Sequence, residues 1–147
     1  MRIGIAHGLF VFNGDEGLFV GPPLVQAYRL GEEAQWIGAV VDDVVAERMG
    51  ELSPKFLSGD GLPLLVDWQV PIKTSAEAGT ASREARHVLA WPRSHRCNFH
   101  DVQYPIPVYD FYRAFEQLFG RFSELPRRDQ AKYENTVEFV NAMLGWA

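Results

Sequence analysis

Four side chains that could bind a metal or act as nucleophiles fall within seven consecutive residues, namely His95, Cys97, His100 and Asp101. Imidazole nitrogens, thiolates and carboxylates are the ligands that zinc prefers. Their spacing, H-x-C-x-x-H-D, matches no established zinc signature, and an irregular segment collects such residues by chance. We therefore expect no metal site, and His95, Cys97 and His100 are the candidates that a metal analysis would test.

Two adjacent carboxylates, Asp42 and Asp43, follow a short apolar run. Paired carboxylates can hold Mg²⁺ through their oxygens. The same pair suits the start of a helix at Val44, because an aspartate at the N-cap accepts a hydrogen bond from an unpaired N–H group of the first turn. We favour the capping role.

A locally basic stretch interrupts an otherwise acidic chain, and it consists of Arg83, Arg86, His87, Arg93, His95 and Arg96. A small anionic ligand or an acidic partner surface could dock on such a stretch. A solvated loop and strand face explains the same residues more simply, and we prefer that interpretation.

Residues 2–43 give the clearest prediction of secondary structure in the chain, and elements of this kind would position any functional side chains. The apolar run from Ile3 to Phe12 contains Gly4 and Gly8, which predicts a strand covered on both faces, with glycines where another backbone comes close. Asn13-Gly14-Asp15 predicts a turn. A second buried strand is expected at residues 36–41.

A helix is expected between these strands, because Pro22-Pro23 suits a first helical turn. Its apolar face should contain Leu24, Ala27, Tyr28 and Gly31, widened by Leu30 and Ala34. A strand, a helix and a second strand form a βαβ crossover, which places the two strands parallel. A unit that begins at residue 2 would leave one edge of the sheet open, and open edges invite pairing with another chain.

This segment resembles the second half of a class III nucleotidyl (adenylate or guanylate) cyclase domain. The family has a strand like RIGIAHG and a helix that opens with a glycine in a pattern like G-x-x-V-N-x-A-x-R-L-E, for which this chain has GPPLVQAYRLG at residues 21–31. The resemblance implies a nucleotide-binding role for Arg29. Val25 stands where the family has asparagine and Gly31 where it has glutamate. The family's metal-binding aspartates lie upstream of the matched part, so we expect either a natural half domain or a chain that starts inside a longer one.

The remaining sheet should come from an antiparallel pair of strands, residues 64–73 and 86–91. We expect a short helix at residues 44–50, a loop at 74–84 and irregular chain from Arg93 to Pro107. The Pro71 ring suggests that the first of these strands lies at an edge of the sheet or contains a bulge.

The end of the chain predicts two helices. Residues 108–122 are rich in aromatic residues at helical spacing, including Tyr112 and Phe115. A second helix should begin near Pro126, with a stripe formed by Tyr133, Val137, Val140, Met143 and Leu144. The fold class is therefore α/β (α+β): a ferredoxin-like, cyclase-like βαβ unit plus β-hairpin in residues 2–91, and two C-terminal helices in residues 108–146, within one domain of 147 residues.

The composition of the chain argues against several classes of protein. A net charge of -5 argues against a nucleic-acid binder, which would need clustered Lys and Arg. No apolar stretch approaches the roughly 20 residues of a membrane-spanning helix, and no signal peptide is visible. With one cysteine, no intrachain disulfide can form, so we expect a cytoplasmic location.

Three hypotheses on function follow. The first is a catalytically inactive cyclase-like domain that binds a partner or senses a nucleotide. The second is part of an active cyclase, completed by another chain that supplies the metal-binding aspartates. The third is a stand-alone interaction module with the aromatic helix of residues 108–122 as its contact surface, so that Tyr112→Ala or Phe115→Ala should weaken association without unfolding the chain. We expect a homo- or hetero-oligomer formed through the open sheet edge or the C-terminal helices, and no cofactor unless a nucleotide brings Mg²⁺ or Mn²⁺.

Overall fold

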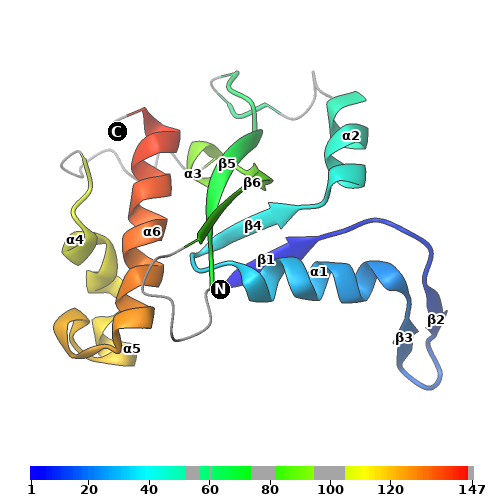
Figure 1. The fold of residues 1–147 in the computed structure, drawn as a ribbon, viewed down its shortest axis with the longest axis horizontal. Helices are drawn as coiled ribbons and strands as arrows, with labels where there is room; N and C mark the ends of the chain where they lie inside the picture. Colours follow the sequence, from blue (N-terminus) through cyan, green and yellow to red (C-terminus); the bar gives the residue numbers. More distant parts are fainter. Residues whose placement is uncertain (52–56, 60, 74–81, 95–104, 146–147) are drawn as a thin grey trace.

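A four-stranded mixed sheet lies at the centre of the computed structural model, with helices on both sides and a separate hairpin at one end (Figure 1). The structure describes residues 1–51, 57–59, 61–73, 82–94 and 105–145. The sheet order is β1-β4-β6-β5, with β1 at Arg2–Ile5, β4 at Gly38–Val41, β5 at Leu65–Ile72 and β6 at Ser82–Leu89. The mixed α/β fold class is confirmed.

The expected βαβ unit is present. β1 and β4 pair in parallel, in the register Gly4↔Val40, and helix α1 (Pro22–Glu33) connects them. A Cβ on Gly4 would lie 1.8 Å from the carbonyl oxygen of Ala27, so α1 can rest on β1 only because Gly4 has no side chain. The sequence prediction of a close backbone approach at a glycine is confirmed here.

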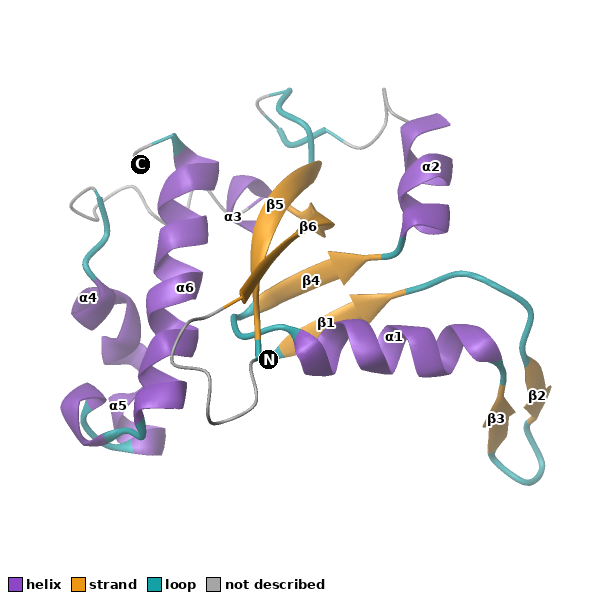
Figure 2. Cartoon of the chain, viewed as in Figure 1, coloured by secondary structure: helices purple, strands orange, loops and turns teal. Residues whose placement is uncertain are grey.

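The first strand is much shorter than expected. It ends at Ile5, whose carbonyl oxygen accepts a 2.9 Å hydrogen bond from Asp42 N, and beyond that point β4 has given way to a helix and offers no further partner. Residues Val11–Asn13 (β2) instead pair antiparallel with Leu18–Val20 (β3) in a two-stranded hairpin that stands apart from the main sheet (Figure 2). The prediction of one long buried strand was wrong because the necessary neighbour stops early.

Helix α1 is only partly buried. Leu30, Gly31 and Ala34 are covered by the rest of the protein, whereas Leu24 and Tyr28, which were expected on the apolar face, are exposed. Figure 1 gives the reason: the N-terminal turns of α1 run past the end of β1 towards the hairpin, where no sheet lies against them.

The second half of the sheet agrees with the sequence in topology and differs at its boundaries. β5 and β6 pair antiparallel, and β5 is an edge strand, as Pro71 suggested. Residues 82–84, expected in a loop, belong to β6 because Ser82 pairs with Ile72. Trp91 was expected to end the strand, but it starts the short helix α3 (Trp91–Ser94) with Pro92 in its first turn.

Helix α2 (Asp43–Glu51) follows β4 and runs through Gly50, where it was expected to stop.

The predicted helix at residues 108–122 is broken into shorter pieces. Its pieces are α4 (Val108–Tyr112), the 3-10 turn η3 (Arg113–Phe115), α5 (Glu116–Phe119) and the 3-10 turn η4 (Phe122–Glu124). The tighter winding places residues three apart on the same side, and the rings of Tyr112 and Phe115 both reach Tyr133, with centroid distances of 4.7 and 5.5 Å. Gly120, with a φ of 81°, then ends α5 before η4 begins.

Helix α6 (Arg127–Leu144) carries the predicted apolar stripe, and all five of its residues are buried. The stripe faces the sheet and the aromatic segment before it. Phe139 packs edge-on against Trp36 at 4.3 Å and near Trp68 at 5.3 Å, in a cluster with Leu30 of α1 and Val40 of β4. One core therefore joins α1 and α6 to the same face of the sheet.

Polar contacts also hold α6 against the segment that connects α1 to β4. Thr136 Oγ1 accepts a 2.8 Å hydrogen bond from Ile37 N, and Asn135 Nδ2 donates a 2.8 Å bond to Gln35 O. The Gln35 amide in turn donates to Arg128 O. These bonds satisfy backbone groups of the segment, which also bridges β5, where Gln35 N donates a 2.7 Å hydrogen bond to Pro71 O.

Candidate functional site

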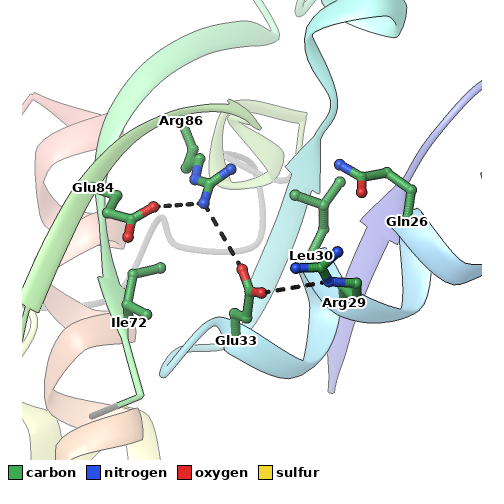
Figure 3. Close-up of a pocket in the computed structure, with 7 residues that line it drawn as sticks. All are labelled: Gln26, Arg29, Leu30, Glu33, Ile72, Glu84 and Arg86. Carbon is green, nitrogen blue, oxygen red and sulfur yellow. Dashed lines mark hydrogen bonds and ion pairs between the residues drawn. The ribbon is translucent and has the colours of Figure 1, made fainter.

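The pocket that contains Arg29 lies between α1 and the β5–β6 hairpin and has a volume of about 460 Å³ (Figure 3). Helix α1 supplies Gln26, Arg29, Leu30 and Glu33, β5 supplies Ile72, and β6 supplies Glu84 and Arg86. Because α1 has 3.6 residues per turn, Gln26, Arg29, Leu30 and Glu33 recur on one face of the helix. The structure thus brings Arg29 together with a second arginine that the sequence did not associate with it.

The charges of this pocket cancel one another. Arg29 Nε lies 3.9 Å from Glu33 Oε1, and Arg86 Nη2 lies 3.8 Å from Glu33 Oε2 and 2.5 Å from Glu84 Oε2. Figure 3 shows Glu33 between the two arginines. Each pair is exposed to solvent and contributes at most about 1 kcal/mol, but a phosphate entering the pocket would meet two carboxylates as well as two guanidinium groups.

Arg29 itself is a largely solvated helix charge, with 67% of its side chain exposed. Val25, one turn earlier, is 61% exposed and is not among the residues that line the pocket. The valine side chain offers neither a donor nor an acceptor. The nucleotide-binding role of Arg29 stays a prediction.

Arg83, Arg93 and His87 of the basic stretch have separate partners, while His95 and Arg96 lie outside the described residues. Arg83 forms a two-pronged ion pair with Glu138 of α6, with N–O distances of 2.8 and 2.6 Å, and this hydrogen-bonded carboxylate raises the pKa of the guanidinium. Arg93 donates to the carbonyl oxygens of Met143 and Pro63 at 3.3 and 2.5 Å. His87 Nδ1 lies 2.7 Å from Asp67 Oδ1. These side chains connect elements of the fold and form no shared anion site.

Asp42 caps helix α2, because its Oδ1 accepts a 2.9 Å hydrogen bond from Val45 N. The neighbouring carboxylate, Asp43, lies 3.7 Å from His87 Nε2 and is almost fully exposed. The capping role is confirmed for Asp42.

The candidate ligands His95, Cys97 and His100, and Asp101 beside them, lie outside the described residues. Within the described ranges, no group of three or more His, Cys, Asp or Glu side chains is arranged to hold a metal ion. The same part of the chain contains no helix long and apolar enough to cross a membrane.

Sequence reasoning missed an exposed apolar surface at the end of the molecule. It consists of residues 9–12, 18–20, Leu24, Val25 and Tyr28, which we call the apolar arm; their exposed fractions range from 42% to 93%. The hairpin carries apolar residues on both faces, since Phe12 pairs with Phe19 and Val11 pairs with Val20 at the next position. The available signal was the recurrence of Val-Phe and Phe-Val on either side of the predicted Asn13-Gly14-Asp15 turn.

A second apolar hollow, of about 380 Å³, lies at the carboxyl ends of β1 and β6. Its lining includes Ile5 and Leu89 from the sheet, Met49 from α2 and Trp91 from α3. With few polar groups to orient a small ligand, this hollow supports no specific chemistry.

The aromatic segment at residues 108–122 is mainly a packing element. Tyr112 is fully buried and its hydroxyl donates a 2.9 Å hydrogen bond to Gly120 O, while Phe115 is half-buried against Tyr133. Replacing Tyr112 by alanine would therefore disturb the fold. The role of residues 108–122 as a contact surface stays a prediction. The exposed apolar side chains of this segment are Tyr109, Leu118 and Phe119.

Comparison with protein-family models, with curated proteins and with solved structures finds no match for this chain.

Proposed function

We propose that this chain is a partner-binding module built on a cyclase-like βαβ core, and that it does not turn over nucleotides. One observation carries the binding role: the apolar arm. Its ten large apolar side chains are all exposed, and groups of exposed apolar residues on soluble proteins commonly mark interaction sites.

The lack of turnover is argued from the residues at the nucleotide position of the resembled family. Val25 cannot provide the hydrogen bonds of the asparagine that it replaces. Arg29 and Arg86 already form ion pairs, with Glu33 and Glu84 respectively. Catalysis by this family would require donors aimed at the charge that develops in the transition state. Here Arg29, the only charged side chain retained from the pattern, is paired with Glu33 of its own helix.

An assay of the purified full chain tests this proposal. We expect no cyclic AMP or cyclic GMP from ATP or GTP with Mg²⁺ or Mn²⁺, and no rise in melting temperature with either nucleotide, because a ligand that binds only the folded state must raise it. Cyclic nucleotide formation by the chain alone would refute the proposal.

A second candidate is part of an active cyclase whose metal-binding aspartates come from another chain. It is favoured by the position of Arg29 and Arg86 on the same pocket. A nucleotide-dependent rise in melting temperature that disappears in Arg29→Ala, and persists in the control Arg113→Ala on α4–η3, would support this candidate over the first.

A further inference from the structure

The β2–β3 hairpin is an incomplete structure in the isolated chain. It is a two-stranded sheet of its own, and five of its six strand residues are classed as exposed, with only Asn13 partly covered. A hairpin of two strands is marginally stable in water, whereas three or more strands with an apolar face are stable. Its outer edges also present backbone groups that no described strand pairs.

The size of the apolar arm matches what an interface requires. The exposed fractions of its ten side chains correspond to about six fully exposed large residues, or on the order of 1,000 Å² at the areas typical of such side chains. A stable interface buries about 800 Å² on each partner. The exposed apolar area of the arm, counted over both faces of the hairpin and the start of α1, exceeds this value, and the share that a second copy covers sets the strength of the contact.

Its charge pattern favours a second copy over a membrane. Residues 8–14 and 17–28 contain no Asp, Glu, Lys or Arg, and the hairpin tip carries only Asp15 and Glu16. Without basic residues the arm has no attraction for anionic lipid head groups. An uncharged surface can meet its own copy across a two-fold axis without like-charge repulsion, even though the whole chain carries a net charge of -5.

We infer that the chain forms a two-fold symmetric homodimer through the apolar arm, with the hairpins of two copies laid edge to edge into one four-stranded sheet. A two-fold axis brings a strand antiparallel to its own copy, so each hairpin gains the third and fourth strands that it lacks. Phe12 and Phe19, whose rings lie 4.8 Å apart, are central to the contact. This inference rests on the proposed partner-binding function and names the partner.

Sedimentation equilibrium of the full chain from low to high micromolar concentration tests the inference. We expect a mass of twice 16.6 kDa. Phe19→Asp places a charge in the middle of the contact and should weaken the dimer at least roughly 30-fold, the loss typical of a central aromatic residue. Leu9→Asp should weaken the dimer as well. Because Leu9 lies outside any helix or strand, this loss cannot be attributed to a hairpin that fails to fold.

The matched control is Leu118→Asp, because Leu118 is 75% exposed on the C-terminal helices and should leave the dimer intact. Circular dichroism and thermal unfolding verify that each variant is folded. A wild-type monomer at every concentration, a dimer unaffected by both arm substitutions, growth into open-ended assemblies, or a monomer that binds phosphatidylcholine vesicles would each overturn the inference.

The two proposals can fail separately. A monomeric chain would refute the dimer and leave the turnover assay unchanged. Formation of cyclic nucleotide would refute the proposed function whatever the mass.

Discussion

Gly4→Ala is the most direct test of how α1 is held on the sheet. The new methyl carbon would lie 1.8 Å from Ala27 O, 2.7 Å from Ala27 C and 3.0 Å from Gly31 N. All three atoms belong to the backbone of α1, so no side-chain rotation can relieve the clash, and the helix must move away from β1.

The cost can be estimated from the contacts that this movement disturbs. Overpacking a core usually costs about 1–3 kcal/mol, and a clash with backbone belongs at the upper end, near 3 kcal/mol. Leu30 and Ala34 would lose part of their contact with the core cluster at the same time. For a chain of this size we expect the melting temperature to fall by about 6–12 °C.

Two other glycines provide a graded control. At Gly31→Ala the nearest foreign atom is Gly4 N at 3.3 Å, a tight contact that offsets the better helix propensity of alanine, so we expect a change within about 1 kcal/mol. At Gly50→Ala, in α2, nothing lies within 4 Å, and stability should stay the same or rise by about 0.5 kcal/mol. Urea unfolding followed by circular dichroism measures all three at one protein concentration, because dimerisation would add to the apparent stability. A Gly4→Ala variant within about 0.5 kcal/mol of wild type would refute the reasoning, since even mild overpacking costs more.

Two further predictions concern the caps and the buried phenols. Asp42→Ala should cost about 1 kcal/mol by removing the N-cap of α2, while the control Glu47→Ala on the exposed face of the same helix should be nearly neutral; equal losses in urea unfolding would contradict the capping role. Burial raises the pKa of the Tyr112 and Tyr133 hydroxyls above their ordinary value, with the charge of Glu116 adding to the effect at Tyr112. The neutral phenols therefore contribute their full stability below about pH 10 and lose it as the pH rises through the raised values. Tyr112→Phe should be less stable than wild type at neutral pH by about 1 kcal/mol, the loss of its hydrogen bond to Gly120, yet lose less stability in alkali; parallel pH profiles would contradict the assignment.

Local sequence patterns were sufficient to predict those helices whose start, cap or buried face is encoded by residues close together in the chain. Pro22-Pro23 marks the start of α1, Asp42 caps α2, and the stripe from Tyr133 to Leu144 gives the buried face of α6. The parallel pairing of β1 with β4 could also be predicted from the sequence, because a strand, a helix and a second strand form a right-handed crossover in which the two strands are parallel.

The candidate site was much less predictable. Arg29 was found from the pattern around it, but its meeting with Glu33, Arg86 and Glu84 depends on α1 lying against β6, more than 50 positions further along the chain. The acidic partners of Arg83 and His87 come from other elements in the same way. Charge counted along the sequence could not show that these cations were already paired.

By itself, the sequence determined helices α1, α2 and α6, the parallel pairing of β1 with β4 and the close backbone approach at Gly4, because propensity and side-chain spacing act over one or two turns. Only the tertiary structure decided that β1 stops at Ile5 and that Leu24 and Tyr28 face solvent. A strand continues only as far as a neighbour supplies backbone hydrogen bonds, and an apolar face is buried only where another element covers it. Both conditions are set by residues far away in the chain.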